Sequence, residues 1–127
     1  MTNDFPPKIG GIQSYLHELW RRLPAERFGV LTVANEDAEA FDSTQNFPIR
    51  RLPVRMLLPT PKTARAIDRY AREIGATHVV LDPVLPIGLI GPSLECSYSL
   101  VAHGAEVAIP GRIPVTRQLM QRAITRA

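Results

Sequence analysis

Apolar residues in the first part of the chain recur at the spacing of a helix. They occupy residues 12–23 at intervals of three and four positions: Ile12, Tyr15, Leu16, Leu19, Trp20 and Leu23. This spacing predicts a one-sided helix with a wide apolar stripe. Glycine and proline are typical of helix boundaries, so we expect the helix to begin after Gly10 and Gly11 and to end near Pro24.

A second helix is predicted over residues 61–76 and a third over residues 114–127. In the second helix, Pro61 suits the first turn and Gly75 suits the end. Its buried stripe is expected to contain four residues at helical spacing: Ala64, Ile67, Ala71 and Ile74. Residues 83–94 are interrupted by proline and glycine and predict only a helical turn.

Four short runs of apolar and β-branched residues predict strands, at residues 27–34, 47–54, 77–82 and 98–104. Prolines in the second run favour a place at a sheet edge. Residues 35–46 are polar and acidic without a period, so a surface loop is expected there.

Strands that alternate with helices predict parallel β-α-β units. The expected fold class is therefore α/β, with a Rossmann-like, doubly wound parallel sheet. Ligands of such sheets bind beyond the carboxyl ends of the strands. Three places qualify: the loop before the first helix, Asp82 with Pro83, and His103 with Gly104.

Size and composition favour one soluble cytoplasmic domain or a piece of one. Of the 127 residues, 45% are hydrophobic, which is enough for a substantial core. No apolar run approaches the roughly 18–20 residues of a membrane span, and the first residues predict no signal peptide. The single cysteine, Cys96, excludes an internal disulfide framework and fits a reducing compartment.

The net charge of +3 is unevenly distributed along the chain. Residues 50–72 contain seven basic side chains and one acid, Asp68. Three of the basic residues, Arg65, Arg69 and Arg72, share an outward face of the second helix. The stretch is either a solvated surface or a patch for phosphate groups, anionic lipid or nucleic acid. Charge alone does not choose between these interpretations.

Gly10 and Gly11 precede a helix whose free backbone N–H groups and dipole favour an anion. Glycines at this place let a phosphate approach the main chain closely. The pair matches neither the P-loop nor the dinucleotide-binding pattern, so a plain turn into a helix is the alternative. Asp4, earlier in the same loop, either binds an acceptor hydroxyl or caps the turn made by Pro6 and Pro7.

His103 ends an apolar strand, where an imidazole can donate a hydrogen bond to a substrate hydroxyl or a charged oxygen. Glu106 follows as an orienting or binding carboxylate. The alternative is a half-buried structural histidine, and this is also our interpretation of His17 and His78. No histidine, cysteine or carboxylate residues have metal-ligand spacing, so no metal site is expected.

Two motifs taken together resemble a known family. Residues 2–19 read TNDFPPKIGGIQSYLHEL, and residues 101–107 read VAHGAEV. They are similar to the N-terminal domain of the retaining glycosyltransferases of family 4, which have the GT-B fold. The resemblance is strongest to the actinobacterial phosphatidylinositol mannosyltransferases, with their TNDFPP, GGIQSYL and HGHEV segments. It covers nearly the whole chain but only about the first third of a family member.

The resemblance implies that residues 1–127 form the acceptor-side domain of an enzyme that transfers a hexose with retention. The donor would be a sugar nucleotide, GDP-mannose, and the acceptor a phosphatidylinositol-type lipid or a glycan. No other cofactor and no nucleic acid are implied. The cytoplasmic location would include peripheral contact with the inner face of the plasma membrane.

The same resemblance assigns roles to single residues. Gly10 and Gly11 would lie against the diphosphate, and His103 would be the catalytic residue that bonds a hydroxyl of the transferred sugar. Asp4 would face the acceptor, and Glu106 would help to bind substrate. The three arginines at positions 65, 69 and 72 would face an anionic acceptor or a membrane surface, although no family motif fixes them.

The chain departs from the family pattern in two respects. Ala105 stands where the family has a second histidine. In addition, few apolar residues precede Thr2, and no second domain follows, so truncation at both ends is expected. Such a piece would be inactive by itself, because the missing domain supplies most of the nucleotide pocket in this family.

A second hypothesis needs no catalysis. In it, the chain is a small α/β module that binds anionic lipid or a phosphorylated partner through the basic helix. The two hypotheses are compatible if the acceptor is itself an anionic lipid.

Overall fold

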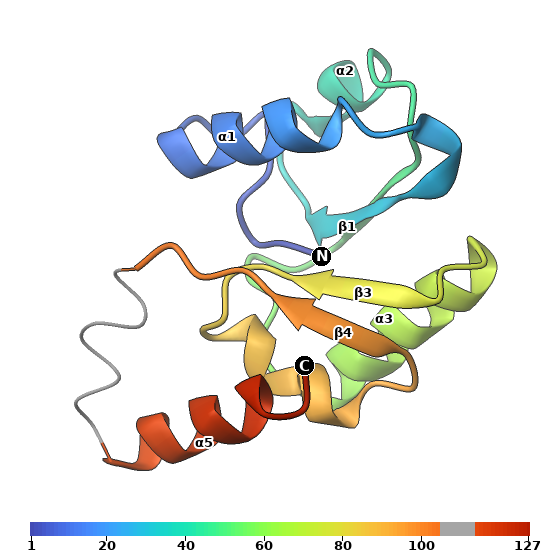
Figure 1. Ribbon diagram of the computed structural model, residues 1–127. Coiled ribbons are helices and arrows are strands. Elements are labelled where there is room, and N and C mark those ends of the chain that lie inside the picture. The colour runs from blue at the N-terminus through green and yellow to red at the C-terminus, as the bar shows by residue number, and fades with distance from the viewer. Residues whose placement is uncertain (105–113) are drawn as a thin grey trace. The chain divides into compact units, whose positions relative to one another are not determined.

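The computed structural model describes residues 1–104 and 114–127, which form a mixed α/β structure (Figure 1). The chain divides into two units. The N-terminal unit is Thr2–Met56, and the C-terminal unit is Leu57–Ala127 together with Met1. Each unit has its own pair of parallel strands and is described by itself.

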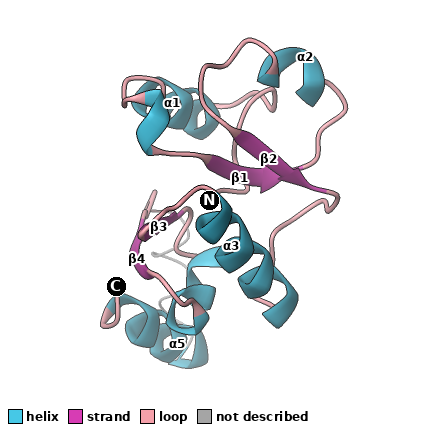
Figure 2. Cartoon of the chain, turned by 90° about the vertical axis from the view of Figure 1, so that its right-hand side faces the viewer, coloured by secondary structure: helices cyan, strands magenta, loops and turns pink. Residues whose placement is uncertain are grey.

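The N-terminal unit contains one parallel strand pair and its helices. Its elements are α1 (Gly11–Trp20), the short 3-10 turn η1 (Ala25–Arg27), β1 (Val30–Val33), α2 (Ala38–Asp42) and β2 (Ile49–Leu52). Val30 of β1 pairs with Ile49 of β2, and the two strands lie side by side in Figure 2. The core of the unit is formed by Phe5, Val30 and Phe47.

The C-terminal unit repeats this plan with a second parallel pair. Its elements are α3 (Pro61–Glu73), β3 (His78–Leu81), the 3-10 segment η2 (Ile87–Ser93), β4 (Ser97–Leu100) and α5 (Pro114–Ile124). His78 pairs with Ser97 and Leu81 with Leu100. The connecting segment η2 packs against both strands and against α3 and α5. Leu81 and Ile87 are completely buried in this unit.

The predicted α/β class with parallel strand pairing is confirmed. The four predicted strands and the three predicted helices form at the predicted places and are shorter than predicted, with β4 and α1 each beginning one residue earlier than expected. In α3, the hydroxyl of Thr60 caps the first turn by accepting a hydrogen bond from the Thr63 N–H. Gly75 follows the helix with a φ of 67°, the left-handed conformation that glycine adopts without strain.

The prediction of a structureless loop over residues 35–46 is wrong, because α2 forms within it. Ala38 is buried, and the side chain of Asn35 accepts a hydrogen bond from the Asp37 N–H just before the helix. A helix of five residues is too short to show a helical period in the sequence.

The predicted apolar stripe of α1 is confirmed only in part, because Leu16 is buried and Trp20 packs against the core of the unit, whereas other members of the stripe are exposed. The side chains of Ile12, Tyr15 and Leu19 are exposed, while the buried positions of the helix are Gln13 and Leu16. Gln13 can be buried because its carboxamide is hydrogen-bonded to Asp4. The stripe of α3 is confirmed for Ala64, Ile67 and Ala71, whereas Ile74 lies exposed at the helix end.

Gly91 in η2 lies so close to the ring of Tyr98, on the next strand, that a larger residue does not fit. A Cβ atom at this position would lie 2.2 Å from Cε2 of Tyr98. The ring cannot move aside easily, because the Tyr98 hydroxyl donates a 2.7 Å hydrogen bond to the Ala123 carbonyl of α5. We therefore expect Gly91→Ala to lower the free energy of unfolding by about 1–3 kcal/mol through overpacking. Urea denaturation measures this change.

The exposed residue Ser93, two positions further along η2, provides the control. Ser93→Ala is expected to change the unfolding free energy by less than about 0.5 kcal/mol. If both variants unfold at the same urea concentration, the packing of Gly91 against Tyr98 is not a constraint on this unit.

Candidate functional site

The loop before α1 is held in shape by the side chain of Asp4. Its Oδ1 atom accepts hydrogen bonds from Lys8 Nζ at 2.6 Å and from Gln13 Nε2 at 2.7 Å. The hydroxyl of Thr2 accepts a hydrogen bond from the Asp4 N–H. Asp4 therefore ties both ends of the loop to the first turn of α1.

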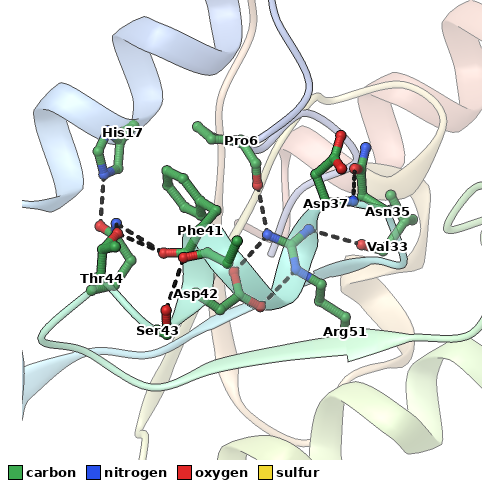
Figure 3. Close-up of polar contacts among 12 residues, drawn as sticks. Pro6, His17, Val33, Asn35, Asp37, Phe41, Asp42, Ser43, Thr44 and Arg51 are labelled. Atoms are coloured by element: carbon green, nitrogen blue, oxygen red, sulfur yellow. Dashed lines mark hydrogen bonds and ion pairs between the residues drawn. The ribbon is translucent and has the colours of Figure 1, made fainter.

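Arg51 on β2 anchors the middle of the same loop (Figure 3). Its guanidinium donates to both carboxylate oxygens of Asp42, each at 2.8 Å. It also donates to the carbonyl of Pro6 at 2.6 Å and to the carbonyl of Val33 at 3.1 Å. A planar guanidinium can satisfy these four contacts at once, which a lysine cannot.

Gly10 and Gly11 lie at the amino end of α1, but they differ in the space around them. Gly10 is the N-cap residue, and a Cβ atom there would lie 2.2 Å from Gln13 Oε1. A Cβ atom on Gly11 would have no atom within 4 Å. Among the described residues, no side chain makes a capping hydrogen bond to the start of this helix, and an uncapped helix start is what an anion-binding site of this kind requires.

In the C-terminal unit, the parallel pairing of β3 and β4 brings two of the predicted places together. Asp82 follows β3 and is 2% exposed; His103 lies three residues beyond the end of β4, and its side chain is 15% exposed. His103 Nε2 and Asp82 Oδ1 are 2.5 Å apart. The strand pairing continues to this point, because the Val101 N–H donates to the Leu81 carbonyl.

The amino group of Met1 is a further charged group close to Asp82. It donates a hydrogen bond to the Val80 carbonyl, and the Met1 carbonyl accepts one from the Asp82 N–H. Burial lowers the pKa of this amino group to about 6, and the Asp82 carboxylate acts in the opposite direction.

The other two histidines are bonded within their own units. His17 Nε2 lies 2.8 Å from Gln45 Oε1, and its ring packs edge-on against Phe41. The two ring nitrogens of His78 lie 2.9 Å from serine hydroxyls of β4, at Ser97 and Ser99. These contacts agree with the structural interpretation of both residues.

The basic stretch separates into buried and exposed parts. Arg51 is not available to a partner, since its side chain is 10% exposed and paired with Asp42. Arg65, Arg69 and Arg72 are exposed on α3, as the helical spacing predicts. Arg72 forms an ion pair with Glu95. Neither Arg65 nor Arg69 is paired with this glutamate. Asp68, on the buried face of α3, accepts a hydrogen bond from the Glu95 N–H.

The sequence-predicted site residues thus fall into two groups. Asp4, Gly10 and Gly11 belong to the N-terminal unit, and His103 belongs to the C-terminal unit. Glu106 lies outside the described residues.

Sequence reasoning missed two residues that shape these groups, Gln13 and Arg51, and it placed Asp82 at a strand end without giving it a partner or a role. The position of Asp82 at a strand end was a usable signal. Nothing in the local sequence marks Gln13 or Arg51, because their partners are set by the fold.

Two kinds of feature are not found in the part of the chain that the structure describes. Across residues 1–104 and 114–127, no three histidine, cysteine or carboxylate side chains are grouped so that they could hold a metal ion. In the same ranges, no helix combines the length and the apolar character needed to cross a bilayer.

Comparison with known proteins shows clear relatives, although no family model matches the chain. A GDP-mannose-dependent monoacylated alpha-(1-6)-phosphatidylinositol monomannoside mannosyltransferase of Corynebacterium glutamicum is 36% identical over 96% of this chain. GDP-mannose-dependent alpha-(1-6)-phosphatidylinositol monomannoside mannosyltransferases of Mycobacterium tuberculosis and Mycolicibacterium smegmatis are each 32% identical over 96% of it.

The chain spans about a third of the length of these relatives, 33% of the first and 34% of the other two. The resemblance to actinobacterial phosphatidylinositol mannosyltransferases that the two sequence motifs indicated is confirmed. The parallel α/β architecture is consistent with the Rossmann-like half of a GT-B glycosyltransferase.

The Arg51 anchor gives a prediction for the loop before α1. We expect Arg51→Lys to lower the unfolding free energy by about 1–3 kcal/mol, because a lysine keeps the charge but loses most of the hydrogen bonds. Hydrogen exchange should also become faster in residues 5–11, which lose their tie to β2. Urea denaturation and amide exchange measure the two effects.

Arg50→Lys, at the neighbouring exposed position of β2, is the matched control and is expected to change neither quantity appreciably. Equal exchange rates in the loop of both variants would show that Arg51 does not hold it.

Proposed function

We propose that this chain, a homologue over nearly its whole length of actinobacterial mannosyltransferases, is the acceptor-side domain of a retaining glycosyltransferase. The donor is GDP-mannose, and the acceptor is a phosphatidylinositol-type lipid that already bears mannose. The observation that carries the proposal is the identity of 32–36% to three enzymes whose names state this donor and acceptor. The α/β architecture supports it, because sugar nucleotides bind at the strand ends of such folds.

The amino end of α1 is proposed to bind the diphosphate of the donor. Its support is chemical: an uncapped helix start, preceded by the glycine N-cap Gly10, offers backbone N–H groups and a positive dipole end. Space around Gly11 allows a phosphate to come close to the main chain. The Asp4–Gln13 contact and the Arg51–Pro6 contact keep this loop preorganised.

His103 is proposed to contact a hydroxyl of the transferred sugar. It follows the end of β4, where ligands of α/β proteins bind, and its side chain is mostly buried but not closed off from solvent. Asp4 and, outside the described residues, Glu106 are proposed to bind the acceptor side and the substrate.

In such a reaction the protein contributes mainly orientation and electrostatic stabilisation. The bond between the sugar and the diphosphate breaks as positive charge develops on the sugar, and the acceptor hydroxyl attacks the same face while its proton passes to the departing diphosphate. Fixed N–H groups at the α1 end stabilise the negative charge that grows on the departing diphosphate. Holding the donor and the acceptor close together in the reactive orientation supplies much of the remaining rate acceleration.

Gly11→Ala tests the diphosphate site without disturbing the free protein. The added methyl group meets nothing within 4 Å, so stability should be unchanged or slightly increased. Binding of GDP-mannose should weaken by roughly tenfold or more, equivalent to about 1.4 kcal/mol, because the methyl group blocks close approach of the phosphate. Calorimetric titration measures binding, and transfer of radiolabelled mannose to a phosphatidylinositol monomannoside measures activity.

Ser14→Ala, one turn further along the exposed side of α1, is the control and should leave binding unchanged. Both assays are made with this chain and with any longer product of its reading frame. If Gly11→Ala and His103→Ala both leave mannose transfer intact, these two residues are not part of the site.

The exposed face of α3 is proposed to contact anionic lipid headgroups at the membrane that holds the acceptor. Arg65 and Arg69 are exposed and one turn apart, and Leu58, shortly before the helix, is also exposed. Basic side chains near an anionic membrane contribute about 1 kcal/mol each to binding. The same face would serve the non-catalytic module of the second hypothesis.

Replacement of Arg65, Arg69 and Arg72 by glutamine is expected to weaken co-sedimentation with phosphatidylinositol-containing vesicles by roughly 100-fold at low salt. Binding to neutral phosphatidylcholine vesicles should be weak for all variants. Arg21→Gln with Arg22→Gln removes two arginines that pair with Glu18 on α1 and serves as the control. If the wild-type chain binds anionic and neutral vesicles equally, α3 does not contact anionic headgroups. Vesicle binding without any mannose transfer would favour the non-catalytic module.

A further inference from the structure

Asp82 is the most deeply buried carboxylate in the described part of the chain, with 2% of its surface exposed. Moving a carboxylate from water into a protein interior costs several kcal/mol unless it is well paired. An apolar side chain at the same strand end would incur no such cost. The presence of an aspartate here therefore calls for a function that its pairing serves.

Asp82 is paired with one of the two ring nitrogens of His103. Oδ1 lies 2.5 Å from Nε2, and the two residues are 21 positions apart in the sequence. The backbone of Asp82 is itself fixed, because its N–H donates to the Met1 carbonyl at 3.0 Å. The carboxylate of Asp82 is therefore a fixed hydrogen-bond acceptor for the imidazole of His103.

This contact determines which nitrogen of the ring carries a proton. A carboxylate only accepts hydrogen bonds, so Nε2 must be the donor. In the neutral ring the second nitrogen, Nδ1, then has a lone pair and acts as an acceptor. A histidine in this state accepts a hydrogen bond from a hydroxyl, in contrast to the donor role that the sequence alone suggested for His103.

We propose that Asp82 is a positioning residue for His103: it fixes the ring orientation and the Nε2–H tautomer, so that substrate hydroxyls are met by Nδ1. The first half of this inference concerns the chain alone, while the second half rests on the proposed function. This second half identifies the group that Nδ1 recognises as a hydroxyl that donates a hydrogen bond, such as one on the transferred sugar. The arrangement is analogous to carboxylates that orient histidines at other sites through the opposite ring nitrogen.

Nitrogen-15 NMR of the histidine rings tests the first half on the chain as it stands. On the alkaline plateau of a pH titration, we expect His103 Nε2 to resonate as a protonated nitrogen and Nδ1 as an unprotonated one. The Nε2–H proton should exchange slowly with water in the wild type. In Asp82→Ala this protection should be lost.

Asp68→Ala is the matched control, because Asp68 is also a buried carboxylate of the C-terminal unit and bonds the Glu95 N–H instead. It should leave the His103 signals unchanged. A wild-type ring protonated at Nδ1, or an Nε2–H that exchanges as fast as in Asp82→Ala, overturns the inference. The wild-type spectrum alone is decisive if Asp82→Ala does not fold.

A double-mutant cycle on mannose transfer tests the second half. Asp82→Ala should lower kcat/KM by roughly tenfold or more in the wild-type background and have no further effect in His103→Ala. Equal losses in both backgrounds would show that Asp82 does not act through His103. If no variant transfers mannose, the proposed function fails, while the NMR result still decides the role of Asp82.

Discussion

Parallel pairing of neighbouring strands is the constraint on which the rest of this structure depends. Two parallel strands cannot be joined by a tight hairpin, so each pair needs a connection that returns the chain to the same end. In the N-terminal unit α2 lies in that connection, and in the C-terminal unit η2 does. The same geometry places the two carboxyl ends of each pair at one edge.

That edge is where the polar residues of the C-terminal unit meet. The register of β3 and β4 continues one residue beyond the strands, through the hydrogen bond from Val101 to Leu81. Asp82 and His103 follow directly from these positions and come within hydrogen-bonding distance. A slip of the register by one residue would turn their side chains to opposite faces of the sheet. The pairing of two apolar strands therefore determines the geometry of a polar contact.

Three polar side chains of the N-terminal unit, Gln13, Asp42 and Arg51, are held by hydrogen bonds that shape the candidate site. Gln13 is 7% exposed and bonded to Asp4, and Arg51 joins Asp42 to the loop before α1. Because an unpaired buried polar group is costly, each contact restricts the backbone that holds it. The loop before α1 is fixed in this way at two points: at Asp4, which is bonded to Gln13, and at Pro6, which is bonded to Arg51.

The sequence by itself determined the type and order of the four strands and of the helices α1, α3 and α5, because periodicity, glycine and proline act within a few residues of one another. It also determined that Asp82 and His103 would lie beyond the ends of two strands, since that follows from alternating strands and helices. Only the tertiary structure decided which face of α1 is buried, that Arg51 bonds Pro6 across 45 positions, and that Asp82 meets His103. Those outcomes depend on the path of the chain between distant residues, and no local pattern encodes that path.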